Sequence, residues 1–149
     1  MMARAVVASL VTALILGGCS SIEPLTEVRI NATDRINPDA ADRASPVVVR
    51  VYELVVRDTF ESADFYELYD NPEELLGDKL VSVREIVLKP EQQWEKSLNL
   101  DGRTRYLGML GAFRQIEKAD WRILKRIDPD DGRPVDVVVD GIELQLTRK

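Results

Sequence analysis

The stretch that decides the fold is VDVVVDGIELQL, residues 135–146. Valine alternates with other residues before Asp140-Gly141, and Ile142, Leu144 and Leu146 alternate after it. Alternation of this kind is typical of half-buried strands, and Asp-Gly is a favoured two-residue hairpin turn. Such a turn pairs residues 139 with 142, 137 with 144 and 135 with 146, which places all six apolar side chains on one face. We therefore predict a β-hairpin with one buried face.

Strand patterns also occur on the N-terminal side of this hairpin. They lie at residues 27–31, 47–54, 80–88, 94–100, 106–113 and 121–127. In the segment 80–88 the parity of the apolar residues changes, which predicts a bulge near Arg84-Glu85. The segment 106–113 is apolar on both faces, as expected of a central strand beneath a helical cover. About seven short strands separated by turns predict a mainly all-β fold, an antiparallel β-sandwich.

A small helical insertion is predicted around residues 60–77. Ser62 is a candidate cap for a first short helix. In a second helix, Asn71 is the expected N-cap, Pro72 occupies the first position, and Glu74 is placed for a capping box. Gly77 suits the C-terminal end of that helix.

The segment from Thr33 to Ser45 is a long polar loop between the first two strands. It contains few apolar residues, and connections of a dozen residues without secondary structure are often functional. Folding alone does not explain this loop, so it is the first candidate for a binding site.

The N-terminal segment has the order of a lipoprotein signal. Arg4 supplies a positive charge, residues 5–16 are mainly apolar, and Leu16-Gly17-Gly18-Cys19 follows. We expect cleavage of a signal peptide at residues 1–18, and a diacylglycerol and an N-acyl chain on Cys19. The apolar run is too short for a membrane-spanning helix, which needs about 20 residues. Residues 19–26 would then be a lipidated tether, and residues 27–149 a single domain.

The composition excludes most enzyme classes. The chain has no histidine, which removes the commonest general base and the commonest metal ligand. Its net charge of −6 and the lack of a basic stripe disfavour nucleic acid. We expect no catalytic residues, no metal site and no cofactor besides the acyl chains.

A local group of basic residues around Trp121 leaves two interpretations open. One is a contact with an acidic partner, and the other, which we favour, is a solvated strand face that balances nearby aspartates. The group consists of Arg114, Lys118, Arg122, Lys125 and Arg126.

The order of motifs along the mature chain resembles the outer-membrane lipoprotein of the type VI secretion system, the TssJ family. A lipobox, a strand and a variable loop precede SPVVVRVYEL at residues 45–54. The similarity continues through Phe60, residues 63–65, Leu68 and residues 76–77. It ends with YLG at 106–108, AFR at 112–114, Ile116, Ala119 and WR at 121–122.

This resemblance implies a transthyretin-like β-sandwich and a non-enzymatic role. The family tethers a trans-envelope complex to the outer membrane, and its domain faces the periplasm. The partner is the periplasmic domain of an inner-membrane IcmF-like protein, bound by the loop between the first two strands. Carried over to this chain, the expected contacts are Arg35, Ile36, Asn37, Pro38 and Asp39, with Ile36 as the apolar anchor. Ser20 after the cysteine is similar to outer-membrane sorting signals.

Two alternatives remain at this level. A periplasmic carrier would hold a small apolar ligand in a cavity between the sheets. A cell-wall hydrolase would need two carboxylates facing each other in a cleft, about 5–9.5 Å apart.

Overall fold

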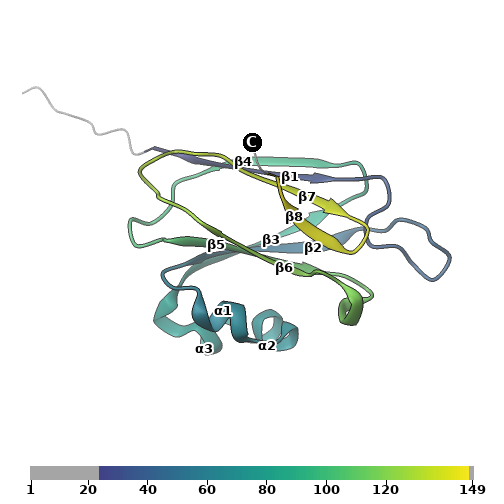
Figure 1. Ribbon diagram of the computed structural model, residues 1–149, viewed down its shortest axis with the longest axis horizontal. Coiled ribbons are helices and arrows are strands. Elements are labelled where there is room, and N and C mark those ends of the chain that lie inside the picture. Colours follow the sequence, from purple (N-terminus) through teal and green to yellow (C-terminus); the bar gives the residue numbers. More distant parts are fainter. Residues whose placement is uncertain (1–23, 148–149) are drawn as a thin grey trace, which may run out of the picture.

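The structure, a computed structural model, describes residues 24–147 and consists of two packed β-sheets with helices on one side (Figure 1). The predicted signal peptide, Cys19 and most of the predicted tether lie outside the described residues. The mainly all-β sandwich expected from the strand patterns is confirmed, and it has eight strands.

The first sheet has the strand order β4-β1-β7-β8. It contains β1 (Thr26–Ala32), β4 (Gln93–Leu98), β7 (Val135–Asp140) and β8 (Glu143–Leu146). β1 pairs with β4 and β7 with β8 in antiparallel fashion, but β1 and β7 are parallel. The predicted antiparallel sandwich is therefore present with one parallel pair, which the strand patterns did not indicate.

The second sheet has the order β3-β2-β5-β6, and all its pairs are antiparallel. It contains β2 (Val47–Leu54), β3 (Leu80–Leu88), β5 (Tyr106–Ala112) and β6 (Arg122–Arg126). β2 and β5 are the two central strands, as the apolar character of both faces of segment 106–113 indicates.

The main core lies between the sheets and follows the alternation of the strands. Val49 and Val51 of β2 face Val137 and Val139 of β7 within one buried cluster. The opposite face of β2 carries Tyr52 and Leu54, which belong to a second cluster beneath the helices. A strand that alternates between two cores has no solvent-exposed face, so its sequence is almost continuously apolar.

Three short helices cover the outer face of the second sheet (Figure 1). They are α1 (Asp58–Ser62), α2 (Phe65–Asp70) and α3 (Pro72–Leu76), followed by the 3₁₀ turn η1 (Gly77–Lys79); a second one, η2 (Ile116–Lys118), follows β5. Phe60 and Leu68 are fully buried under this cover. Tyr52 donates a hydrogen bond of 2.9 Å from its hydroxyl to the carbonyl of Leu68, so its polar group is satisfied within the second core.

The local details of the helical insertion differ from the prediction. Asp64, rather than Ser62, caps a helix, and it forms a capping box with Glu67. Asn71 makes no side-chain cap hydrogen bond, although Pro72 does begin α3. Asp64 is the N-cap of α2, because its carboxylate accepts a hydrogen bond of 2.9 Å from the backbone N–H of Glu67.

The predicted bulge in β3 lies elsewhere. Arg84 and Glu85 pair regularly with Val51 and Arg50, and the register shifts between Glu53 and Leu54 of β2 instead. The parity change has another cause: Val83 packs beneath the helices, whereas Ile86 belongs to the core between the sheets.

The predicted hairpin is present, but its register is shifted by two residues. Val139 pairs with Leu144 and Asp140 with Glu143, so the turn residues are Gly141 and Ile142. Gly141 has a φ of +55°, which suits the first central position of a hairpin turn. A shift of two residues keeps the same side chains on the same face, so the buried face was predicted correctly.

Gly108 in β5 is required for the contact with α1. A Cβ atom at this position would lie 2.6–2.9 Å from three atoms of the Phe60 ring. We predict that Gly108→Ala lowers the free energy of unfolding by about 1–3 kcal/mol, because the ring must move within a packed core. Urea unfolding checks this, with Gly102→Ala as the control, since a Cβ there meets nothing within 4 Å. Equal stability of both variants would contradict the close contact.

Candidate partner-binding loop

The β1–β2 loop, residues 33–46, lies at the end of the sandwich opposite to the start of the described chain (Figure 1). β1 begins next to the predicted tether, and its seven residues span about 23 Å. The loop therefore leaves the sheet at the far end of that strand and projects beyond both sheets. This position presents it to a partner that approaches from the side away from the tether.

Asn37 fixes the base of the loop. Its backbone has a φ of +47°, a left-handed conformation that asparagine tolerates better than most residues. Its N–H donates to the carbonyl of Gly141 at 2.7 Å. Its side-chain Nδ2 donates to the carbonyl of Pro46 at 2.7 Å, and its Oδ1 accepts from the N–H of Arg114 at 2.8 Å. One buried side chain thus joins both ends of the loop to the β5–β6 connection.

The tip of the loop, Asp39–Arg43, has its own network. The Asp39 carboxylate accepts from the backbone N–H groups of Ala41 and Arg43 at 2.8 and 3.0 Å. The Arg43 guanidinium binds the same carboxylate at 2.8 Å. These hydrogen bonds lower the pKa of Asp39, the backbone contribution from Arg43 being the largest. The tip is exposed but structured, so a contact made there would cost little conformational entropy.

An ion pair fastens the start of the loop to β7. Arg35 donates to the two carboxylate oxygens of Asp140 from Nε and Nη2, at 2.7 and 2.5 Å. Thr33 donates its hydroxyl to the same carboxylate at 2.8 Å. The hydrogen bonds from Arg35 and then Thr33 lower the pKa of Asp140 from 3.8 to about 2.

The structure places the five predicted contact residues in two different environments. Arg35 is exposed, and Pro38 and Asp39 are partly exposed. Ile36 is fully buried in the core between the sheets, and Asn37 is only 3% exposed. The expectation that Ile36 is an apolar anchor for a partner conflicts with this burial, because its side chain already fills the core of its own domain. Asn37 supports the loop from within.

Sequence reasoning missed the residues that support the loop from outside it. Asp140 was assigned only to a turn, and Arg114 only to a basic group and to the motif AFR of the family resemblance. Ser45, at the end of the loop, accepts a hydrogen bond of 3.0 Å from Nε of Arg114 and donates to the carbonyl of Asn37. No local pattern marks Asp140 or Arg114 as a support of the loop, because both are distant from it in the sequence.

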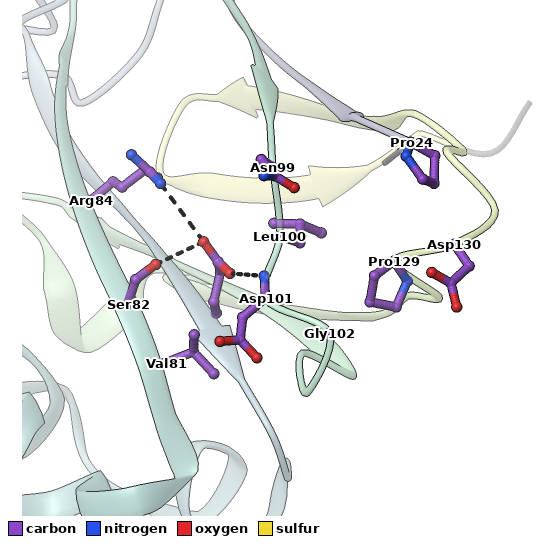
Figure 2. Close-up of a pocket in the computed structure, with 11 residues that line it drawn as sticks. Pro24, Val81, Ser82, Arg84, Asn99, Leu100, Asp101, Gly102, Pro129 and Asp130 are labelled. Atoms are coloured by element: carbon purple, nitrogen blue, oxygen red, sulfur yellow. Dashed lines mark hydrogen bonds and ion pairs between the residues drawn. The ribbon is translucent and has the colours of Figure 1, made fainter. Parts of the chain in front are cut away.

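The hollow at the tether end of the sandwich offers little to the two alternative functions (Figure 2). It measures about 560 Å³, and its lining includes Glu53, Arg84 and Asp101. Glu53 is 3% exposed and is held by the hydroxyls of Ser82 and Thr104 at 2.8 and 3.1 Å. The lining is polar and open to solvent, unlike the apolar cavity of a carrier.

Two of the three carboxylates that line this hollow, those of Glu53 and Asp101, are also committed to structural partners. Arg84 lies 3.8 Å from Glu53, and Asp101 forms an ion pair of 3.1 Å with Arg103. Among residues 24–147, no group of three or more potential metal ligands occurs. In the same part of the chain, no helix has the length and apolar character that crossing a membrane requires.

The ion pair of Arg35 with Asp140 gives a testable pH dependence. A carboxyl whose pKa is lower in the folded state stabilises the fold above its unfolded value near 3.8, and this contribution is lost as the pH falls toward 2. We predict that Asp140→Asn lowers the free energy of unfolding at pH 7 by at most about 1 kcal/mol, since exposed ion pairs contribute little.

Urea unfolding at a series of pH values measures this effect. The Asp140→Asn protein should lose less stability than the wild type between pH 4 and pH 2. Asp78→Asn is the control, because Asp78 is exposed and has no ion-pair partner within 4 Å among the described residues. Parallel pH curves for Asp140→Asn and the wild type would show that the ion pair does not act in solution.

Comparisons with known proteins identify a family and several solved structures that this chain resembles. The family described as type VI secretion lipoprotein (VasD, EvfM, TssJ) matches residues 25–148. The comparison with curated proteins gave no match. The T6SS lipoprotein TssJ1 from Pseudomonas aeruginosa is 29% identical with a TM-score of 0.80, over 85% of this chain and 97% of that chain.

Two further solved structures share the fold. Serratia marcescens Lip, a membrane-bound component of the type VI secretion system, is 20% identical with a TM-score of 0.74, over 86% of this chain and 99% of that one. A chain of a type VI membrane complex is 27% identical with a TM-score of 0.74, over 84% of this chain and 98% of that chain. The family is a structural component of the secretion system and not a family of enzymes, which excludes the hydrolase alternative. The chain described here belongs to the type VI secretion lipoprotein family.

Proposed function

We propose that the protein is an outer-membrane-anchored tether of the type VI secretion core complex, whose domain faces the periplasm. Signal peptide 1–18 is removed, and the diacylglycerol and N-acyl chain on Cys19 hold the protein in the outer membrane. The β1–β2 loop binds the periplasmic domain of the inner-membrane IcmF-like protein.

The observation that carries this proposal is that the start of the described chain and the β1–β2 loop lie at opposite ends of the sandwich (Figure 1). The chain enters the domain at Pro24, and the β1–β2 loop projects from the other end of the sandwich (Figure 1). A lipid on Cys19 therefore leaves the loop facing away from the membrane. A partner that spans the periplasm from the inner membrane meets this end first.

The organisation of the loop supports a binding role. Its base is fixed by Asn37, and its tip by the Asp39–Arg43 network, while Arg35 and Arg43 remain largely exposed. The partner meets a surface that is already ordered, so little conformational entropy is lost on binding. The similarity to a chain of a type VI membrane complex also supports an assembly partner.

Tethering requires no chemistry from the domain. The lipid anchor confines the loop to a surface, and this raises the effective concentration of one partner near the other. Two or more acyl chains hold a protein firmly in a bilayer, whereas one chain holds it only marginally. A loop interface of modest size is then sufficient for a stable complex.

The test is calorimetry of residues 20–149 with the periplasmic domain of the inner-membrane component encoded nearby. In one variant, Gly-Ser-Gly-Ser-Gly replaces Asp39–Arg43, and Ile36, Asn37 and Ser45 stay because they support the fold. We expect binding to weaken at least tenfold because the exposed tip is lost. The melting temperature should change by no more than about 3 °C, since exposed substitutions affect stability little.

The matched control replaces the turn Asp128–Gly132, at the tether end, with the same five residues, and it should bind like the wild type. Undiminished binding by the tip variant would exclude the tip as the contact. A folded wild-type protein that does not bind at all would contradict the tethering proposal.

Lipidation is tested separately with Cys19→Ser in the full chain. The hydroxyl cannot form the thioether, so we expect no incorporation of labelled palmitate and loss of the protein from the outer-membrane fraction. Ser20→Ala is the control and should keep both the label and the membrane association. Membrane association that persists in Cys19→Ser would contradict anchoring through this residue.

A further inference from the structure

We propose that the β5–β6 loop and Tyr66 of α2 form a second contact surface beside the β1–β2 loop, and that this surface binds an acidic segment of the same partner. This inference rests on the proposed tethering function and extends the binding surface beyond the β1–β2 loop.

A shallow hollow of about 310 Å³ separates α2 from the β5–β6 loop. Tyr66 forms one wall, and the other consists of Arg114, Gln115, Ile116, Glu117 and Lys118. The 3₁₀ turn η2 shapes this wall, because the N–H of Lys118 donates to the carbonyl of Gln115 at 3.0 Å. The hollow therefore has an aromatic side and a charged side that belong to separate elements.

Tyr66 is an exposed aromatic residue on a fixed support. It is 62% exposed, the most exposed of the large hydrophobic residues in the described chain. Its neighbour Phe65 stacks on Tyr69 at 5.4 Å and meets Trp121 edge-on at 5.4 Å. These contacts hold α2 against the sheet. The Tyr66 ring meets Phe65 edge-on at 5.3 Å, and most of the residue remains exposed to solvent. Tyrosine on a rigid element contributes strongly to protein interfaces because it loses little entropy there.

The charges around the hollow favour an acidic ligand. Arg114 and Lys118 have no carboxylate within 4 Å among the described residues, whereas most other arginines of the domain form ion pairs. Glu117 is the one carboxylate in the lining, so the local balance is positive. This differs from the chain as a whole, whose net charge is −6. An acidic partner segment would supply the missing counter-charges.

Arg114 makes this surface continuous with the β1–β2 loop. Its backbone N–H donates to Asn37 at 2.8 Å, and its guanidinium donates to Ser45 at 3.0 Å. The positive charge of Arg114 also helps to lower the pKa of Asp39 at the loop tip. A partner that covers the tip of the loop thus lies next to the hollow.

The structure divides the basic group that the sequence placed around Trp121. Arg122 donates to the carbonyls of Phe60 and Ala63 at 2.7 and 2.8 Å and supports α1. Arg126 pairs with Tyr106 at the far end of β6, and Lys125 precedes it. Only Arg114 and Lys118 line the hollow, so the group does not act as one patch.

The experiment extends the calorimetric titration to Tyr66→Ala and Lys118→Glu. We expect each to weaken binding about tenfold, as for residues near the centre of an interface. Binding of Lys118→Glu should also depend less on salt between 0.05 and 0.5 M, where about a threefold change in Debye length occurs. Both side chains are largely exposed, so the melting temperature should change by no more than about 3 °C.

Lys125→Glu makes the same change of charge at the other end of β6, and it should bind like the wild type. Wild-type affinity in both Tyr66→Ala and Lys118→Glu, together with lost binding in the tip variant, would overturn the second surface and leave the tether intact. Absence of binding by the wild type would overturn both proposals.

Discussion

The sheet β3-β2-β5-β6 must be buried on both faces, and most of the architecture follows from this requirement. β2 carries valines toward one core and Tyr52 and Leu54 toward the other. The first sheet covers one face, and the three short helices cover the second. Burial of the second face also explains Gly108, because the helix layer approaches β5 so closely that the Phe60 ring lies directly on the backbone of β5. Removal of the helices would expose an apolar face large enough to cause association.

Asn37 has a comparable role for the functional end of the molecule. Through one left-handed residue, the loop is joined to the β7–β8 turn, to the start of β2 and to the segment after β5. All three segments come from different parts of the chain. The loop is therefore a part of the folded domain and not an appendage, and its exposed tip is held relative to both sheets.

The sequence was sufficient for the features that have a clear period or a strong local signal. The strands, the helical insertion and the buried face of the hairpin follow from alternation, because a side chain on the wrong face would remain in water. The hairpin register could not be obtained in this way, since pairings that differ by two residues bury the same side chains. The parallel pairing of β1 with β7 was also inaccessible, because it joins residues more than one hundred positions apart and leaves no local pattern.

The candidate site was predicted as a segment but not residue by residue. Loop length and polarity identified residues 33–45 as the candidate segment. Within it, Ile36 faces the core and not a partner. One large apolar residue in a polar loop can anchor the loop to a partner or to its own domain, and the sequence does not distinguish these two roles. The supporting partners Asp140 and Arg114 are distant in sequence, so only the fold brings them to the loop. The basic residues around Trp121 do not form one patch, because residues that are close in sequence can lie at opposite ends of one strand.

The parallel pair of β1 and β7 has a consequence for the order of folding. Among the described residues β1 has β4 and β7 as its strand partners, so the first strand of the domain is completed by one of the last. When the chain is made from its N-terminus, β1 has no strand partner until β4 follows it, and its sheet stays open until β7 is complete. Such long-range closure slows folding. The first strand of the domain would therefore wait longest for its partners, and the sheet that contains it would close last.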